Sequence, residues 1–355
     1  MNPSSMGFRM PAEWDTHEAT WIGWPQNRSD WPGKFSTIPW VYSEIARHLV
    51  PGEIVRIIVE SETHEARARR VLSRAGVDLT RVEFFRFPTN RGWTRDFGPM
   101  FVRRDSKPPE VAIVRFRFNG WAKYGDWKKD DRVAERAART LGCRIFRAQI
   151  DKRDVVLEGG AIDVNGRGTL IATEECLLDQ NTQSRNPGLS CKDTEAVLCE
   201  NLGVSNILWL GRGIEGDDTH GHVDDLCRFV DSKTVVICRE ENSRDYNHTV
   251  LEENLDRLSS MRLEDGSKID VVPIPMPEPL VFNRQRLPAS YANFYIANSA
   301  VLVPTFNDPR DRQALGILSE LITDRPIVGI HAVDLVWGLG TLHCLTQQQP
   351  GVKRG

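Results

Sequence analysis

The chain has 355 residues, of which 40% are hydrophobic and 27% are charged, which is typical of a globular protein with a sizeable core. Its formal net charge of −3 argues against general affinity for nucleic acids, and no apolar run approaches membrane-spanning length. The first seven residues, Met1-Asn-Pro-Ser-Ser-Met-Gly, lack the basic and apolar parts of a signal peptide, so a cytoplasmic protein is expected.

The predicted elements repeat in the order strand, strand, helix, strand. A first, incomplete copy has a strand at 20–24, a helix at 38–49 and a strand at 55–59, followed by an extra helix at 62–75 and a strand at 82–87. The second copy covers strands at 100–103 and 111–116, a helix at 130–141 and a strand at 144–147. The last three copies have strands at 161–164, 169–172 and 207–210 with a helix at 191–202, strands at 227–230, 234–238 and 268–274 with a helix at 245–261, and strands at 294–297, 300–304 and 327–330 with a helix at 309–322.

The closing strands of these copies recur roughly every sixty residues, the spacing of one supersecondary unit repeated along the chain. This predicts an α/β fold in which five ββαβ units close into a five-bladed β/α propeller with pseudo-five-fold symmetry. Residues 1–355 would then form a single domain. A doubly wound parallel sheet with crossover helices is the alternative, and the hairpin in each unit favours the propeller.

Polar motifs follow the closing strands, and equivalent strand ends in a ring would face its axis. The motifs are Asn90-Arg-Gly-Trp93-Thr-Arg95-Asp96-Phe-Gly-Pro99, Glu158-Gly-Gly160, Asp217-Asp-Thr-His220-Gly-His222-Val-Asp224-Asp225, and the segment that ends in Cys344. A cavity at the axis would be lined by carboxylates, a histidine, a tryptophan and a cysteine. Taken singly, each motif has an ordinary structural interpretation, such as a surface ion pair for Asp96 or a core aromatic ring for Trp93 and Trp121.

The C-terminal cysteine stands in the stretch Gly338-Leu-Gly-Thr-Leu-His-Cys344. The glycines permit close approach of the backbone to a neighbour, and the alternation around Cys344 predicts a short buried strand. All seven cysteines are scattered and odd in number, which suits reduced thiols better than disulfides.

A cavity with several carboxylates, one histidine and one cysteine suits a guanidinium compound. Paired carboxylates match the planar N–H donors of a guanidinium, and a thiolate can attack its central carbon. A neighbouring imidazole can protonate departing ammonia and then activate water. This chemistry requires no cofactor and no metal, and its partner would be a small guanidino substrate.

Three other interpretations stay open. The cluster His220, His222, Asp224 and Cys227 has the residue types of a zinc hydrolase. A guanidine-binding protein without catalysis would not need a thiol, so Cys344 argues against it. An amidinotransferase differs mainly in using an amine rather than water as the final acceptor. The sequence also leaves homo-oligomerisation open.

Several motifs resemble those of agmatine deiminases and the related bacterial peptidylarginine deiminase-type proteins of the guanidino-modifying (pentein) superfamily. They are Trp93-Thr-Arg95-Asp96-Phe-Gly98-Pro99, Glu158-Gly-Gly, Gly221-His222-Val-Asp224 and Leu342-His343-Cys344-Leu-Thr-Gln-Gln-Gln-Pro, and the resemblance extends upstream to Trp14-Asp15. It implies the five-bladed propeller, with Cys344 as nucleophile, His222 as acid and base, Asp96 and Asp224 as guanidinium clamps, and Glu158 as a further carboxylate.

The activity that the resemblance implies is a hydrolytic deimination through a covalent thiouronium on the cysteine. It would convert agmatine to N-carbamoylputrescine and ammonia, a step of putrescine and polyamine biosynthesis, with arginine or peptidyl arginine as alternative substrates. Trp93, Trp121 and Lys123, together with the two clamping aspartates, are the expected substrate contacts.

The chain departs from the family pattern at the outer end of the expected site. Arg91 replaces the usual acidic residue, Lys123 lies in a segment that lacks the usual Trp-Gly-Gly, and Leu339 and Thr341 replace the usual Gly and Asn. Cations at the mouth would repel the amine of agmatine, so a substrate with a carboxylate or a peptide carbonyl at this end also stays open.

Overall fold

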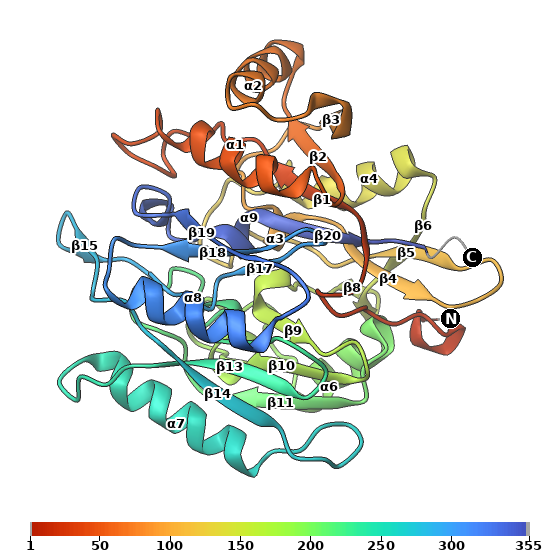
Figure 1. Ribbon diagram of the computed structural model, residues 1–355. Coiled ribbons are helices and arrows are strands. Elements are labelled where there is room, and N and C mark those ends of the chain that lie inside the picture. Colours follow the sequence, from red (N-terminus) through yellow and green to blue (C-terminus); the bar gives the residue numbers. More distant parts are fainter. Residues whose placement is uncertain (1, 353–355) are drawn as a thin grey trace.

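Five small sheets, each joined to at least one helix, make up most of the molecule (Figure 1). The structure is a computed structural model that describes residues 2–352. Four of the sheets have three strands in one order: the first two are antiparallel, and a helix leads to a third that is parallel to the second. The fold is therefore mixed α/β. The alternative of one doubly wound sheet is wrong, because the strands lie in separate sheets.

These four sheets follow one another along the chain, each with its own helix. They are β4 (Met100–Arg104), β5 (Glu110–Arg115), α4 (Val133–Leu141) and β6 (Arg144–Arg147); β9 (Ile162–Val164), β10 (Thr169–Thr173), α6 (Cys191–Leu202) and β11 (Asn206–Leu210); β12 (Cys227–Phe229), β13 (Thr234–Arg239), α7 (Tyr246–Ser260) and β14 (Asp270–Pro275); and β17 (Tyr295–Ile296), β18 (Val301–Thr305), α8 (Arg310–Leu321) and β19 (Ile327–His331).

The fifth sheet joins the two ends of the chain. Its strands run β20 (Thr346–Pro350), β1 (His17–Gly23), β2 (Ile54–Val59) and β3 (Val82–Arg86), with helices α1 (Ile38–Leu49) and α2 (Glu62–Arg74). Because β20 pairs antiparallel with β1, the C-terminal strand supplies the hairpin partner that the first copy lacks in the sequence. This closure also brings the segment that carries Cys344 next to the N-terminal strand.

Shorter elements connect the sheets. They are the helices α3 (Thr94–Phe97), α5 (Glu174–Leu178) and α9 (Leu342–Leu345), the two-residue strands β7 (Gln149–Ile150), β8 (Arg153–Asp154), β15 (Val281–Phe282) and β16 (Gln285–Arg286), and the 3-10 turns η1 (Ser4–Met6), η2 (Leu79–Arg81), η3 (Asp130–Arg132), η4 (Gly159–Ala161), η5 (Val223–Asp225) and η6 (Val336–Gly338). Among these, α3 contacts α9 and η4, and η4 contacts η5. Turns that come from four different parts of the chain thus meet in one place.

The predicted helices agree with the observed ones because their ends carry clear signals. Helix α6 begins at a capping box in which the Ser190 hydroxyl accepts from the Asp193 N–H and the Asp193 carboxylate accepts from the Ser190 N–H. It ends at Gly203, whose φ of 68° is the left-handed conformation that glycine adopts most easily.

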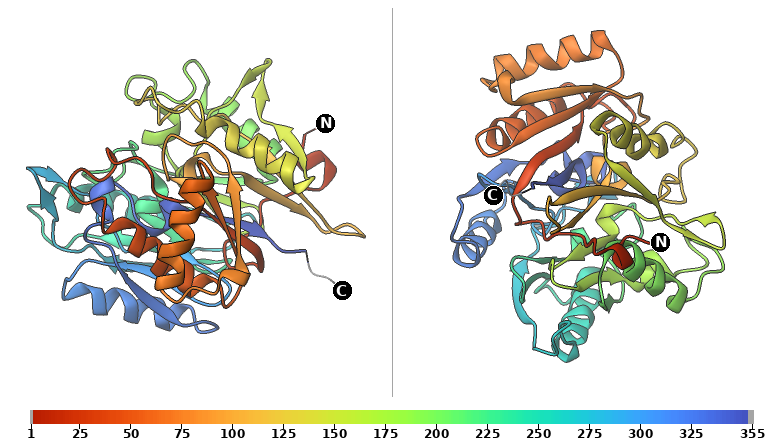
Figure 2. Two further views of the ribbon diagram at one scale, coloured as in Figure 1. Left: turned by 90° about the horizontal axis from the view of Figure 1, so that it is seen from above. Right: turned by 90° about the vertical axis from the view of Figure 1, so that its right-hand side faces the viewer.

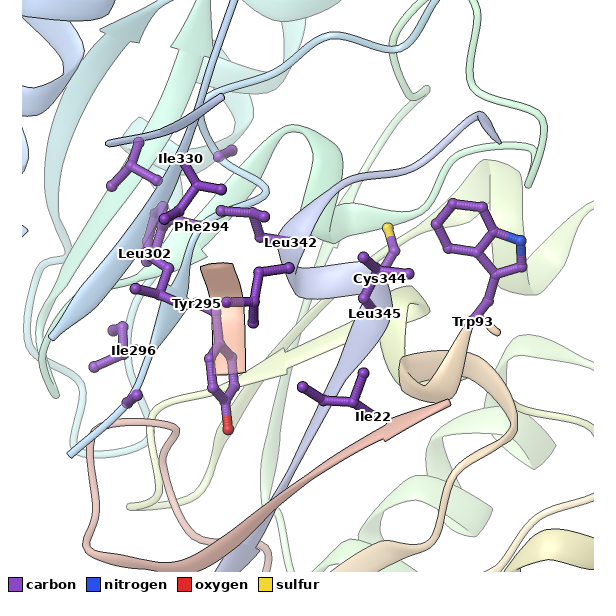
Figure 3. Packing of buried hydrophobic residues seen from close by; sticks show 14 of the residues in the cluster. Ile22, Trp93, Phe294, Tyr295, Ile296, Leu302, Ile330, Leu342, Cys344 and Leu345 are labelled. Atoms are coloured by element: carbon purple, nitrogen blue, oxygen red, sulfur yellow. The ribbon is translucent and has the colours of Figure 1, made fainter. Parts of the chain in front are cut away.

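The helices lie on the outside, and the five sheets follow one another around the middle in the right-hand view of Figure 2. Figure 3 shows part of the apolar core beside α9, where Ile22, Tyr295, Leu342 and Leu345 pack together. Among the described residues, none of the helices combines the length and the hydrophobicity needed to cross a membrane.

Candidate active site

Cys344 lies on the one-turn helix α9, and the prediction that it lies on a short buried strand is therefore wrong. The Asn293 side chain explains the turn, because its Oδ1 accepts from the Thr341 hydroxyl at 2.7 Å and from the His343 N–H at 3.0 Å. Its Nδ2 lies 3.1 Å from the Cys344 sulfur. Asn293 comes from a distant segment, so the local sequence pattern could not show this cap.

The glycines before Cys344 permit the close approach that the sequence predicts, and the structure shows that the neighbour is Trp93. A Cβ atom on Gly340 would lie 2.8 Å from the Trp93 ring and 3.2 Å from the Cys344 sulfur. One on Gly338 would lie 2.4 Å from the Trp31 ring. Figure 3 shows the sulfur on the side of α9 that faces Trp93. The glycines therefore allow an indole ring to lie against the cysteine.

The five residues expected to do chemistry are brought together. The Cys344 sulfur lies 3.7 Å from Asp224 Oδ2. His222 Nδ1 lies 3.8 Å from Asp96 Oδ1 and 3.9 Å from Asp224 Oδ1, and its Nε2 lies 3.6 Å from Glu158 Oε2. All five residues are at most 5% exposed. They come from α3, the Glu158 turn, the segment before β12, and α9, so only the tertiary structure can assemble them.

Gly160 lies in the middle of this cluster. Its N–H donates to Asp96 Oδ1 at 3.2 Å, and the Trp121 indole N–H donates to Asp96 Oδ2 at 2.9 Å. A Cβ atom on Gly160 would lie 2.5 Å from His222 Nδ1. The Glu158-Gly-Gly motif therefore lets the backbone pass between the histidine and the two aspartates.

Several polar atoms of the cluster are buried without a hydrogen-bond partner within residues 2–352. They are Nδ1 and Nε2 of His222 and Oδ1 of Asp224. Buried polar atoms are nearly always paired in folded proteins, so unpaired ones at the centre of a cluster indicate a ligand site. An unpaired carboxylate oxygen next to other carboxylates favours a cationic ligand.

The carboxylates of the cluster differ in their protonation. Burial raises the pKa of Asp96 to about 6, with the His222 imidazole acting in the opposite direction. Burial also opposes ionisation of Asp224, but the His343 imidazole more than compensates and lowers its pKa. For Glu158, the Arg185 guanidinium overcomes burial and lowers the pKa. Asp224 and Glu158 are thus ionised at neutral pH.

The thiol and the imidazole hold their protons in the absence of a ligand. Burial and the negative charges of Asp224, Asp225 and Asp96 raise the pKa of Cys344 well above its usual value. Burial would lower the pKa of His222, but Asp96 and other neighbours raise it well above its usual value. A bound cation would oppose the negative field that keeps the thiol neutral.

A pocket leads to Cys344. Its lining includes Trp93, Asp96 and Trp121 as predicted, and also Ser29, Asp30, Arg91, Tyr124, Asp218, Thr219, Gly338 and Leu339. Lys123 does not line this pocket; its Nζ lies 2.5 Å from Asp218 Oδ1. Asp218 does line the pocket and pairs with Lys123, and the expected contact of Lys123 with substrate stays a prediction.

The second cation at the mouth is also paired. Arg91 Nη1 donates to Asp30 Oδ1 at 2.5 Å, and Nη2 donates to Asp126 Oδ1 at 3.1 Å. Its guanidinium carbon lies 4.3 Å from the centre of the Tyr124 ring. The carboxylates therefore offset the repulsion of an amine that Arg91 and Lys123 suggest when the sequence is considered alone.

Residues 9–350 match the model of the Porphyromonas-type peptidyl-arginine deiminase family. The chain belongs to this family. It is 33% identical to an agmatine deiminase of Ectopseudomonas mendocina over 98% of this chain and 97% of the relative. Among solved structures, an agmatine deiminase of Enterococcus faecalis has a TM-score of 0.89 at 30% identity, covering 98% of this chain and 97% of that one. A substrate-bound Cys-to-Ser agmatine deiminase of C. jejuni has a TM-score of 0.84 at 28% identity, covering 98% and 97%.

This member of the deiminase family is an enzyme, a guanidino hydrolase of the agmatine deiminase type. The zinc cluster that the sequence also permits is not assembled. In residues 2–352, two groups of side chains bring possible metal-binding atoms within 4.8 Å of one another. Glu158, Cys176 and His222 form one group, and Asp224, Asp225 and Cys344 form the other. His220 instead lies 3.0 Å from Asp179, so it is separated from the predicted partners.

Sequence reasoning missed several residues that support the deiminase-family site. His343 bridges Asp224 and Glu13, Arg185 pairs with Glu158, and Asn293 caps α9. His343 and Glu13 had a weak signal in the sequence, since His343 precedes the cysteine and Glu13 precedes the Trp14-Asp15 motif. Arg185 and Asn293 lie outside every motif and could be found only from the structure.

Proposed function

We propose that the chain hydrolyses agmatine to N-carbamoylputrescine and ammonia, with Cys344 as the nucleophile. The observation that carries this proposal is the buried cluster in which Asp96, Asp224 and Glu158 surround His222 beside the Cys344 thiol, which lines the pocket. The unpaired oxygen of Asp224 and the unpaired nitrogens of His222 are the atoms that a bound guanidinium would contact.

The guanidinium would lie between two carboxylates. Asp96 and Asp224 face the same imidazole from different elements, so a planar cation between them can donate to both. Trp93 lies against the cysteine and offers an apolar wall beside the cation. This arrangement would hold the central carbon of the guanidinium near the Cys344 sulfur.

Binding would also activate the nucleophile. The positive charge of the substrate offsets the carboxylates that hold the thiol neutral, so the thiol proton is released to solvent on binding. The thiolate then forms a bond to the central carbon, and His222 donates its proton to one nitrogen. That C–N bond breaks, ammonia leaves, and a thiouronium remains on Cys344.

Hydrolysis would reverse the roles of the same groups. A water molecule attacks the thiouronium carbon and gives one proton to the neutral His222. The C–S bond breaks, its electrons return to the sulfur, the remaining hydroxyl proton passes to that sulfur, and the neutral ureido product leaves. Asp96 and Asp224 oppose charge that develops on the nitrogens in both steps, which is electrostatic stabilisation of the transition states.

The charges at the pocket mouth are compatible with agmatine. Asp30 and Asp218 line the pocket and pair with Arg91 and Lys123, so they offset the repulsion of a distal ammonium by these two cations. The full-length similarity to proteins named agmatine deiminase supports the same choice.

We also infer that the five sheets close into the single five-bladed β/α propeller expected from the sequence. The repeated order of strands and the pairing of β20 with β1 support this closure. In such a ring the turns that carry Asp96, His222 and Cys344 would lie on the axis.

Product analysis tests the function. The purified chain is incubated with agmatine, arginine and peptidyl arginine, and ammonia and the ureido product are quantified for each. Agmatine should give equal amounts of both products with the highest kcat/KM, and Cys344→Ala should give none. Turnover of arginine or peptidyl arginine in preference to agmatine would refute the substrate assignment, and ammonia without a ureido product would refute the hydrolytic mechanism.

A further inference from the structure

His343, the residue before the cysteine, lies between two buried carboxylates. Its Nδ1 is 2.7 Å from Asp224 Oδ2, and its Nε2 is 2.8 Å from Glu13 Oε2. The three side chains are at most 4% exposed. An ionised carboxylate can only accept hydrogen bonds, so each ring nitrogen donates one. The geometry therefore describes a ring that carries both protons and a positive charge.

The far side of this bridge is held by arginines. Glu13 Oε1 lies 2.9 Å from Arg228 Nη2 in an ion pair, and Glu13 Oε2 lies 3.3 Å from Arg95 Nη2. Arg228 Nε in turn faces Asp163 Oδ2 at 3.4 Å. Burial opposes ionisation of Glu13, but Arg228 and His343 lower its pKa well below the usual value. Glu13 is thus a fixed anion against which the ring of His343 is held.

Asp224 differs from the other two aspartates near the nucleophile. Asp225 receives the Asn293 amide at 2.9 Å, and Asp96 receives the Trp121 indole N–H, so both have neutral donors. Within residues 2–352, Asp224 is the one of these three that accepts a hydrogen bond from an imidazole. Burial raises the pKa of Asp225 well above its usual value, whereas the pKa of Asp224 is lowered.

We propose that His343, held by Glu13, is a positioning residue that keeps Asp224 ionised and leaves its Oδ1 free for the guanidinium. The imidazole does not reach the substrate, because its two nitrogens are occupied by Asp224 and Glu13. This role deepens the proposed function and rests on it, since Asp224 acts there as a clamp. It assigns an electrostatic task to a residue that neither attacks nor protonates the substrate.

The consequence concerns the pH at which the site stops attracting a cation. Asp224 also faces His222 Nδ1 at 3.9 Å and the Cys344 sulfur at 3.7 Å, and Asp225 and Asp96 lie near the same thiol. Without the charge on His343, Asp224, Asp225 and Asp96 would compete with one another for protons. His222 would then be the cation that remains in direct contact with Asp224. Asp224 would then protonate at a higher pH, and the clamp would fail there.

The test uses His343→Asn, whose side-chain amide can still donate from the position of Nδ1 but carries no charge. Because the pKa of Asp224 is lowered, alkylation of Cys344 is measured from pH 3 to pH 8 with 2-chloroacetamidine, a planar cation, and with neutral 2-chloroacetamide. The ratio of the two rates reports the attraction of the site for a cation. We expect the pH midpoint of this ratio to rise by about one unit in the variant, which lowers the ratio about fivefold at the midpoint of the parent.

A matched control is His17→Asn. His17 is equally buried and its ring also bridges two acceptors, Glu53 Oε1 at 3.1 Å and the Glu13 carbonyl oxygen at 2.7 Å, but it does not contact Asp224. The His17→Asn substitution removes a buried ion pair of the same kind, and the pH midpoint of the rate ratio should stay unchanged. Glu13→Gln should shift the midpoint in the same direction as His343→Asn, and it carries the test if that variant does not fold.

Each outcome is decisive. An unchanged midpoint in folded His343→Asn, or an equal shift in His17→Asn, would overturn the inference. The reagent requires only a cation site beside the thiol, so the result does not depend on agmatine as substrate. A parent that prefers the cationic reagent but does not hydrolyse agmatine would refute the substrate assignment and leave the role of His343 supported; a parent without the preference would overturn that role.

Discussion

Gly160 offers the sharpest test of the site, because one added methyl group would enter its centre. A Cβ atom at this position would lie 2.5 Å from His222 Nδ1 and 3.0 Å from both Asp224 Oδ2 and Asp96 Oδ1. Real Cβ atoms essentially never approach neighbours closer than 3.0 Å, so Gly160→Ala must displace the imidazole or the turn that carries Glu158. The substitution changes no charge and removes no functional group.

The expected loss of activity follows from the size of that displacement. An ordinary van der Waals contact begins near 3.4 Å, so the two groups must separate by roughly an ångström. A misplacement of about 1 Å in a catalytic site costs on the order of 100-fold in rate. We therefore expect kcat/KM to fall at least about 100-fold, which corresponds to about 3 kcal/mol of lost transition-state stabilisation.

Ammonia release under steady-state conditions measures the loss, and thermal unfolding shows whether the variant is folded. Gly316→Ala is the matched control, since Gly316 lies in α8 with nothing within 4 Å of an added Cβ. It should keep full activity and gain up to about 1 kcal/mol of stability from the helix propensity of alanine. Folded Gly160→Ala with activity within tenfold of the parent would show that the cluster does not form the reaction site.

Three further predictions concern the nucleophile, the pH profile and the mouth of the pocket. Cys344→Ala should abolish turnover, while calorimetry should still detect binding of agmatine; Cys344→Ser should be nearly inactive because a hydroxyl is far less ionised than a thiol. Activity of Cys344→Ala within tenfold of the parent would mean that another residue is the nucleophile. Because the pKa of Asp96 is raised to about 6, this clamp is ionised above that pH and protonated below it, so kcat/KM should decline on the acid side of pH 6. A profile of kcat/KM that stays level down to pH 5 would contradict the assignment of Asp96 as a clamp. Arg91→Gln should raise the agmatine-to-arginine ratio of kcat/KM several-fold, about 1 kcal/mol or less, by removing a cation that lines the pocket, whereas an unchanged ratio would mean that Arg91 does not act on the distal amine.

The unit of the fold could be predicted because its signals are local. Helix α1 and helix α6 have the bounds that periodicity and caps indicate, and the order of strand, strand, helix and strand repeats along the chain. The missing strand of the first unit could not be found in this way. It is β20, some 300 residues away, and its pairing with β1 depends on contacts between the two ends of the chain.

The candidate site also has a part that the sequence predicts and a part that only the structure shows. The sequence by itself determined the set of residues that we propose for the chemistry, since Asp96, Glu158, His222, Asp224 and Cys344 each stand in a motif beside a glycine or a strand end. Only the tertiary structure decided their charges. Burial and neighbours from other units set the pKa of Asp96 and of Asp224 in opposite directions, although both are aspartates in similar turns. Such differences arise from burial, which dominates for Asp96, and from the neighbouring imidazole of His343, which dominates over burial for Asp224, and a linear sequence contains no distances between units.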